Sequence, residues 1–171
     1  MKQLILGGAR SGKSRTAEQR AMATKKSLIY IATGQAGDEE MRERIAVHKK
    51  SRSDHWRLIE EPLKLAETLQ RIDSNRSAIV VDCLTLWLSN CLYAECFQEE
   101  KNKLLSTLHE LQSDVFFVSN EVGSGVVPLG QLSREFVDQS GWLHQALVEH
   151  CNKVTLVVAG LPLELKSEQS G

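Results

Sequence analysis

The chain has 171 residues, which is enough for one domain with its own hydrophobic core and leaves no room for two. Hydrophobic residues make up 42% of the sequence and charged residues 25%, as in an ordinary globular protein. The formal net charge of -1 gives no general attraction to nucleic acids or anionic membranes, and no apolar run approaches the ~20 residues that span a bilayer. We therefore expect one domain over residues 1–166 and a frayed polar tail over residues 167–171, with no nucleic-acid partner and no membrane span.

The amino-terminal residues combine a short apolar strand, residues 2–6, with a glycine-rich loop and a helical pattern over residues 13–25. The loop reads G-x-x-x-x-G-K-S and consists of Gly7, Gly8, Ala9, Arg10, Ser11, Gly12, Lys13 and Ser14. Such a turn directs several backbone N–H groups at one point, where the helix dipole adds positive potential. The pattern predicts a nucleoside triphosphate site in which Lys13 reaches the outer phosphates and the Ser14 hydroxyl binds Mg²⁺. Arg10 either adds charge near the phosphates or is a solvated loop residue, and the sequence favours neither.

Apolar runs of strand length alternate with helical patterns along the whole chain. The strand candidates are residues 2–6, 27–33, 78–82, 115–119 and 154–159, with a weaker edge candidate at 56–60. The helix candidates are residues 13–25, 38–52, 63–72, a long stretch over 84–112, and 133–152. The strands are rich in Val, Ile and Phe and lack polar alternation, which is typical of strands covered on both faces. The sequence therefore predicts a three-layer α/β fold with a mostly parallel sheet.

In such a sheet, ligands bind outside the carboxyl ends of the strands. This rule predicts one functional rim formed by the phosphate loop and the polar residues that follow the other strands. Those positions are residues 33–35, 82, 120–121 and 160–162.

The second helical pattern, residues 38–52, contains the most distinctive ionisable residue of the chain, His48. Acidic residues at its start suit the positive end of a helix, and the apolar spacing places His48 on the inner face. That spacing by itself favours a packed core histidine. The alternative is a nucleophile, because Lys49, Lys50 and Arg52 could hold a polyphosphate beside an imidazole that attacks phosphorus readily.

Asp82 ends the strongly apolar run over residues 78–82. An acidic residue there is the expected second half of a phosphate-loop site, where it holds Mg²⁺ directly or through water opposite Ser14. The alternative is a capping role for the following helix near Thr85. We favour the metal role, because the phosphate loop creates a need for it.

Cysteine and histidine usage gives no sign of a disulfide framework or a zinc site. Cys83, Cys91, Cys96 and Cys151 form no C-x-x-C pair, which indicates reduced thiols in a cytoplasmic protein. His144, His150 and Cys151 match no usual zinc spacing, so we interpret them as ordinary helix residues.

The segment over residues 120–128 reads N-E-V-G-S-G-V-V-P and directly follows the strand candidate at 115–119. Its glycines and proline suit a shaped loop at the active rim that closes on a substrate. An ordinary strand-to-helix connection accounts for it equally well.

Together these segments resemble the bifunctional adenosylcobinamide kinase / adenosylcobinamide-phosphate guanylyltransferase family of cobalamin biosynthesis. The resemblance rests on residues 7–14, 30–33, 38–48, 55–57, 120–128 and 156–160, which occur in the same order over nearly the whole chain. The phosphate loop is generic, whereas the N-E-V-G-x-G run combined with the His48 region is specific.

The resemblance implies a RecA-like P-loop fold, a homotrimer and two activities. In the first, a nucleoside triphosphate phosphorylates the aminopropanol hydroxyl of adenosylcobinamide. In the second, GTP guanylylates a histidine of the enzyme with loss of pyrophosphate, and adenosylcobinamide phosphate then accepts the GMP to give adenosylcobinamide-GDP. The implied substrates are ATP and GTP with Mg²⁺, together with the corrinoid.

The resemblance also assigns roles to particular residues. His48 takes the position of the guanylylated histidine, which reverses the preference for a core residue, and Lys13 is the second expected catalytic residue. Positions expected to line the GTP site are Ala32, Thr33, Gly34, Lys49, Lys50, Ser51, Arg52, Glu60 and Asp82. Some relatives carry two adjacent histidines, of which Val47 replaces the first here, and some carry Glu at the position of Asp82.

Three other functions compete with this interpretation. An unrelated small-molecule kinase would use Lys13, Ser14 and Asp82 but would have no use for His48. A regulatory GTPase would require an N-K-x-D motif for guanine, which the sequence lacks. A DNA-dependent ATPase would need a basic, aromatic-rich track, and aromatic residues make up only 5% of this chain.

Overall fold

The computed structural model describes residues 1–34 and 55–167. The predicted helix over residues 38–52 lies outside these ranges. The elements are β1 (Lys2–Gly7), α1 (Lys13–Ala23), β2 (Ser27–Ala32), β3 (Trp56–Glu60), α3 (Leu65–Ile72), β4 (Ser77–Asp82), α4 (Leu84–Tyr93), α5 (Phe97–Thr107), β5 (Asp114–Asn120), α6 (Gln131–His150), β6 (Lys153–Val158) and β7 (Leu161–Ser167).

The strands form one sheet in the order β3-β2-β4-β5-β1-β6-β7. All neighbours pair in parallel except β6 and β7, which are antiparallel. The predicted parallel sheet is therefore confirmed, and the weak strand candidate at 56–60 is confirmed as the edge strand β3. The register places Gly7 opposite Asn120 and Ala32 opposite Asp82, so several predicted rim residues end neighbouring strands.

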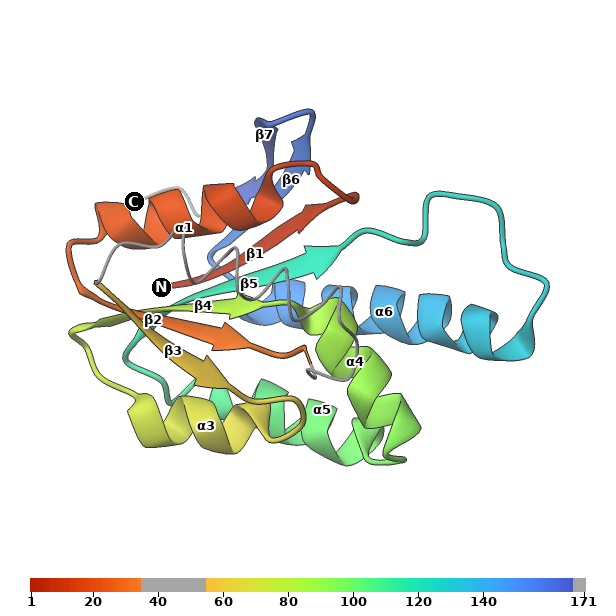
Figure 1. The fold of residues 1–171 in the computed structure, drawn as a ribbon, viewed down its shortest axis with the longest axis horizontal. Coiled ribbons are helices and arrows are strands. Elements are labelled where there is room, and N and C mark those ends of the chain that lie inside the picture. Colours follow the sequence, from red (N-terminus) through yellow and green to blue (C-terminus); the bar gives the residue numbers. More distant parts are fainter. Residues whose placement is uncertain (35–54, 168–171) are drawn as a thin grey trace.

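Helices cover both faces of the sheet, which gives three layers (Figure 1). On one face α1 packs through Ala17 and Ala21 against a cluster that includes Ile5, Phe116 and Val118. The other face carries α3, α4, α5 and α6 over the larger part of the core. Successive residues of β5 contribute to opposite clusters, because side chains alternate across a strand. Burial on both faces explains why these strands read as continuous apolar runs.

The expectation of one long helix over residues 84–112 is wrong, because the chain breaks between α4 and α5. Glu95 adopts a positive φ of 56°, and the Cys96 N–H donates to the carbonyl of Cys91 at 2.9 Å. The break lets α5 turn back along the sheet, where Phe97 meets Trp87 edge-to-face with ring centroids 5.9 Å apart. A local C-cap with a left-handed residue thus ends α4 within a helical pattern that is continuous in sequence, and the contact of Phe97 with Trp87 accompanies the turn.

β7 was not among the predicted strands. It ends at Ser167, the first residue of the expected tail, and residues 168–171 lie outside the described part of the chain. Glu164 connects it to the rest of the molecule, accepting hydrogen bonds from Arg20 on α1 and from Thr155 on β6. The overlooked signal is the alternation of Leu161, Leu163 and Leu165 with other residues, which is the period of a strand, although all three leucines are exposed here.

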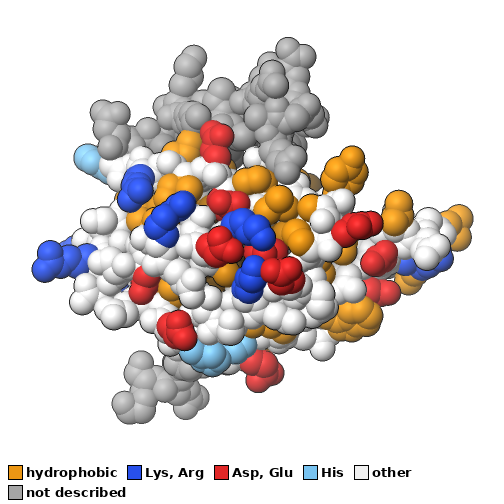
Figure 2. All heavy atoms as spheres, turned by 90° about the horizontal axis from the view of Figure 1, so that it is seen from below, with side chains coloured by type: hydrophobic (Ala, Val, Ile, Leu, Met, Phe, Trp, Pro, Cys, Tyr) orange, Lys and Arg blue, Asp and Glu red, His pale blue; other side chains and the backbone are white. Residues whose placement is uncertain are grey.

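The face formed by α3 and α5 carries basic and acidic side chains close together (Figure 2). Nζ of Lys103 lies 2.6 Å from Oε1 of Glu99 and 3.2 Å from Oε1 of Glu100, and Nζ of Lys64 lies 2.7 Å from the same Glu100 oxygen. Because these lysines are paired with carboxylates, this face presents mixed charge rather than the uniform positive track that binds single-stranded nucleic acid. None of the helices in the described ranges has both the length and the apolar character needed to cross a bilayer.

Candidate active site

The phosphate loop connects the end of β1 to the start of α1, as predicted. Two of its glycines are required by the space around them. A Cβ on Gly7 would lie 2.3 Å from Oγ of Ser11 and 2.7 Å from the carbonyl oxygen of Val157. Gly12 has a φ of +95°, and a Cβ added to it would lie 3.3 Å from the Cα of Gly160. A side chain at either position would therefore distort the loop.

The outer surface of the loop is open to solvent, whereas its inner side is anchored. Gly8, Ala9 and Arg10 are exposed, and Lys13 and Ser14 are half-buried. Nζ of Lys13 donates to the carbonyl of Gly8 at 3.0 Å, so this side chain lies back across the loop. A bound phosphate would offer that ammonium a charged acceptor in place of a carbonyl, which is a stronger hydrogen bond.

A second contact ties the loop to the turn between β6 and β7. The Gly160 N–H donates to the carbonyl of Ser11 at 2.8 Å, and Gly160 has a φ of +78°. Gly160 therefore lies at the predicted rim. Oγ of Ser11 is buried, and no described group serves as its hydrogen-bond partner.

Asp82 ends β4 at the same edge of the sheet and is half-buried. The phenolic hydroxyl of Tyr30, on the neighbouring strand β2, donates to its Oδ2 at 2.5 Å. The first helical residues of α4 receive no side-chain cap from the N-cap position, which is Cys83. This contact of Asp82 runs across the sheet rather than along the helix, which fits the favoured role as a metal ligand better than the alternative role as a helix cap.

The backbone around Asp82 is fixed by Thr33, which is fully buried. Its hydroxyl donates to the carbonyl of Cys83 at 2.6 Å and accepts from the Cys83 N–H at 2.9 Å. Asn90 of α4 in turn donates to the carbonyl of Thr33 at 2.8 Å. Thr33 therefore joins the ends of β2 and β4, so its side chain supports the site from beneath rather than facing a ligand.

Two further predicted positions, Ala32 and Glu60, are the last residues of β2 and β3 and lie at the carboxyl ends of these strands. Ala32 is buried and pairs in register with both Asp82 and Glu60. Glu60 is exposed at the end of β3, and Gly34 is the last described residue before the gap. The predicted residues His48, Lys49, Lys50, Ser51 and Arg52 lie outside the described residues.

Sequence reasoning missed a polar cluster beneath the end of β5. Nε2 of His144, on α6, lies 2.7 Å from Oγ of Ser119, which lies 3.3 Å from Oγ1 of Thr85. Thr85 also accepts the backbone N–H of Asn120 at 2.8 Å. Burial lowers the pKa of His144, against the opposing effect of the Glu121 carboxylate. A lone histidine on a helix gave no signal for this cluster, because its partners are distant in sequence.

Glu121 links this cluster to the phosphate loop. Its backbone N–H donates to the carbonyl of Gly7 at 3.1 Å, and its Oε1 accepts the Gly123 N–H at 2.8 Å. Burial alone would raise the pKa of Glu121, but hydrogen bonds from Ser124 and the Gly123 N–H, with His144 nearby, hold it below its usual value. The carboxylate thus shapes the turn that leads out of β5. The interpretation of residues 120–128 as part of the rim gains support from this direct contact with the phosphate loop.

Ser14 and Asp82 are the described residues suited to an Mg²⁺ ion. Both offer oxygen atoms, the ligand type that Mg²⁺ prefers. Asp82 is the last residue of β4, and Ser14 is the second residue of α1. The described residues contain no group of three or more His, Cys, Asp or Glu side chains placed to hold a metal ion. Burial raises the pKa of Cys83 and, to about 12, that of Cys151, so both remain thiols.

The sequence matches the family model described as cobinamide kinase / cobinamide phosphate guanyltransferase over residues 3–165. It is 54% identical to the bifunctional adenosylcobalamin biosynthesis protein CobP of Pseudomonas aeruginosa, over 98% of this chain and 99% of that one. It is 33% and 35% identical to the CobU proteins of Escherichia coli K12 and Salmonella typhimurium LT2, which carry the same bifunctional description, each over 95% of this chain and 98% of the relative.

Solved structures resemble this one in fold. The RadB recombinase superposes with a TM-score of 0.52 at 13% identity, over 91% of this chain and 73% of that one. A KaiC-like protein from Pyrococcus horikoshii OT3 superposes with a TM-score of 0.50 at 14% identity, over 91% of this chain and 69% of that one. These likenesses confirm the expected RecA-like P-loop fold.

Proposed function

The chain belongs to the cobinamide kinase / cobinamide phosphate guanyltransferase family, and we propose that it phosphorylates adenosylcobinamide and then transfers GMP to the product through a guanylyl-histidine on His48. One observation carries this proposal beyond family membership. The phosphate loop and Asp82 lie on one edge of the sheet, where a triphosphate and its metal would be needed. Family membership also leaves the unrelated kinase, the regulatory GTPase and the DNA-dependent ATPase without support.

In the kinase step, the aminopropanol hydroxyl oxygen of adenosylcobinamide attacks the γ-phosphorus of the nucleoside triphosphate. A new O–P bond forms, the bond from the γ-phosphorus to the β,γ-bridging oxygen breaks, the hydroxyl proton passes to solvent and a nucleoside diphosphate leaves. Such transfers depend mainly on positioning and charge neutralisation. The loop amides and Lys13 provide both, because they converge on the outer phosphates.

In the second reaction, an imidazole nitrogen of His48 attacks the α-phosphorus of GTP and pyrophosphate leaves. A terminal phosphate oxygen of adenosylcobinamide phosphate then attacks the same phosphorus, which breaks the N–P bond, releases His48 and gives adenosylcobinamide-GDP. The covalent step divides one difficult displacement into two easier ones. Lys49, Lys50, Ser51 and Arg52, which follow His48 directly in sequence, are proposed to hold the phosphates of GTP.

The remaining site residues are proposed to position the nucleotide. Ala32, Thr33, Gly34 and Glu60 form the edge of the GTP site, with Thr33 acting through the backbone of Asp82 and Cys83. Ser14 and Asp82 would hold Mg²⁺, which when bound neutralises charge on the phosphates. Arg10 is exposed on the loop and can add charge there. We also propose that the protein is a homotrimer, on the basis of the family resemblance. We propose a cytoplasmic location because its cysteines are free.

Product analysis tests the proposed function. The purified protein is incubated with adenosylcobinamide and ATP, then with GTP, and the corrinoids are separated and identified by mass spectrometry. We expect adenosylcobinamide phosphate after the first incubation and adenosylcobinamide-GDP with pyrophosphate after the second. Recovery of unmodified adenosylcobinamide from both incubations would contradict the proposal.

A further inference from the structure

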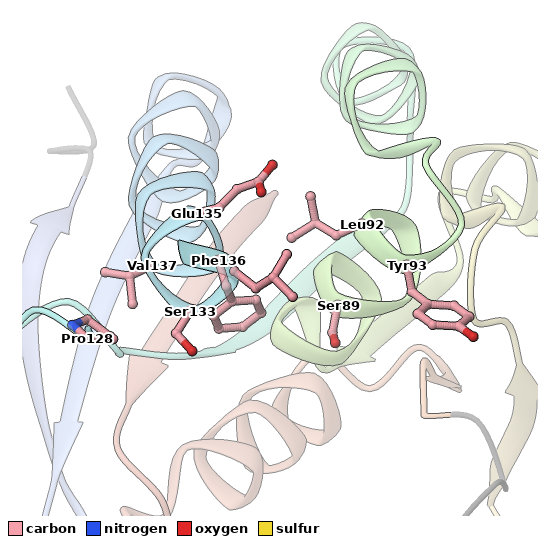
Figure 3. Close-up of a pocket in the computed structure, with 9 residues that line it drawn as sticks. Ser89, Leu92, Tyr93, Pro128, Ser133, Glu135, Phe136 and Val137 are labelled. Atoms are coloured by element: carbon pink, nitrogen blue, oxygen red, sulfur yellow. The ribbon is translucent and has the colours of Figure 1, made fainter. Parts of the chain in front are cut away.

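A groove lies between α4 and the start of α6, apart from the phosphate loop. It has a volume of about 470 Å³, within the range of small-molecule sites. Ser89 and Leu92 from α4 face Ser133 and Phe136 from α6 across it, and Pro128 closes one end (Figure 3). Both walls begin at the carboxyl edge of the sheet, since α4 follows β4 directly and residues 121–130 connect β5 to α6.

Exposed apolar side chains surround this groove. Tyr93 at its rim is 94% exposed, Leu132 is 82% exposed, and Val126 and Leu129 in the preceding segment are 96% and 97% exposed. Scattered apolar residues on a surface are ordinary, but a cluster of this kind beside a hollow marks a binding site. The cluster belongs to the segment that contacts the phosphate loop through the Glu121 N–H and the Gly7 carbonyl.

The wall of the groove formed by residues 128–129 is held in place from within the chain. The guanidinium of Arg134 donates to the carbonyl of Pro128 at 3.3 Å and to the carbonyl of Leu129. This cation is therefore directed at its own backbone. A wall fixed in this way is preorganised for a ligand, which reduces the entropy lost on binding.

Charge and polarity restrict what can bind there. Among the described residues that line the groove, the ionisable side chains are Glu135, which is acidic, and the phenol of Tyr93, and none is basic. A nucleotide phosphate would meet a carboxylate here and no cation. A corrin ring instead offers apolar faces, neutral amide side chains and, with its cobalt and adenosyl group, a net positive charge. That combination matches apolar walls, two serine hydroxyls and one carboxylate.

We propose that this groove binds the corrin ring of adenosylcobinamide, with Tyr93 and Leu132 against the ring. The inference rests on the proposed function, which requires the corrinoid hydroxyl to reach a phosphate bound at the loop. Placed in the groove, the ring lies at the same edge of the sheet as the loop. The flexible aminopropanol arm then extends along residues 121–128 toward Gly7 and Lys13.

The test measures adenosylcobinamide binding by equilibrium dialysis, using the visible absorbance of the corrinoid itself. The variants are Leu132→Ser and Tyr93→Ala, with Leu165→Ser as the matched control, because Leu165 is a leucine 56% exposed on the edge strand β7. We expect each groove variant to bind about tenfold more weakly or worse, since each loses most of an exposed apolar side chain that the bound ring would cover. The control is expected to bind like the unaltered protein.

Two further measurements distinguish a wrong placement of the corrin ring from a wrong proposed function. Covalent labelling by GTP requires no corrinoid and should be unchanged in the groove variants, and sedimentation reports the oligomeric state. Equal corrinoid binding by all variants would overturn the placement in the groove but not the proposed function. A changed oligomeric state with unchanged affinity would assign the groove to a second copy of the chain and also overturn it. Failure of the unaltered protein to bind any corrinoid would overturn the proposed function itself.

Discussion

The hydroxyl of Tyr30 donates a hydrogen bond of 2.5 Å to Oδ2 of Asp82, across two neighbouring parallel strands. Tyr30 also packs edge-to-face on Trp56, with ring centroids 6.1 Å apart, so the phenol is held from two sides. The carboxylate that we propose for Mg²⁺ is therefore oriented before any metal binds. Loss of such a supporting hydrogen bond typically lowers metal affinity or activity by about 10- to 100-fold.

Removing this hydrogen bond should weaken metal binding without disturbing the fold. Tyr30→Phe keeps the aromatic ring and its contact with Trp56 but loses the donor to Asp82. We expect the Mg²⁺ concentration for half-maximal kinase activity to rise about tenfold, the lower end of the effect of losing such a partner. Thermal unfolding of both proteins serves as the control, and an unchanged Mg²⁺ dependence would show that Tyr30 does not position Asp82.

The phosphate loop offers a matched pair of glycine substitutions. Gly7→Ala would place a Cβ 2.3 Å from the Ser11 hydroxyl and 2.7 Å from the Val157 carbonyl, whereas an added Cβ at Gly8 has nothing within 4 Å. We expect Gly7→Ala to lower the free energy of unfolding by about 1–3 kcal/mol, because the Val157 backbone cannot move aside easily. Gly8→Ala should unfold at nearly the unaltered temperature. Calorimetry of the two variants checks this, and equal destabilisation would contradict the described packing of the loop.

His144 predicts a pH dependence of stability. Burial lowers its pKa in the folded protein below the ordinary 6.5, so the unfolded chain binds the proton more readily. Stability contributed by neutral His144 is therefore fully present above about pH 6.5 and is lost as pH falls from there toward the folded pKa. In His144→Gln, the free energy of unfolding should decline less on acidification from pH 7 to about pH 5. Urea titrations at the two pH values measure it, and an equal decline would assign the acid sensitivity to other groups.

The sheet, the phosphate loop and Asp82 could be predicted because their signals are local. A glycine-rich loop between a strand and a helix, and an acid that ends an apolar strand, are each contained in a few consecutive residues. Edge strand β3 was also predicted from its own short pattern. The family resemblance rested mainly on two other local segments, the N-E-V-G-x-G run at residues 120–125 and the region that leads to His48.

The supporting contacts could not be predicted, because they join residues distant in sequence. Tyr30 and Asp82 are 52 positions apart, Thr33 and Cys83 are 50 apart, and Ser119 and His144 are 25 apart. In a parallel sheet the crossover connections bring such residues together, and no local periodicity records the pairing. The α4–α5 break was missed for a different reason, since Glu95 takes the left-handed position that a glycine usually marks at the end of a helix.

Labelling with GTP that carries a radioactive α-phosphate reports the covalent role proposed for His48. After denaturation, the unaltered protein should retain label that acid releases and alkali does not, as expected for a phosphorus–nitrogen bond. His48→Ala should retain none while keeping kinase activity toward adenosylcobinamide, and His55→Ala, which alters an exposed histidine seven positions further along the sequence, should label normally. A normal yield of covalent GMP on the His48→Ala protein would contradict the account.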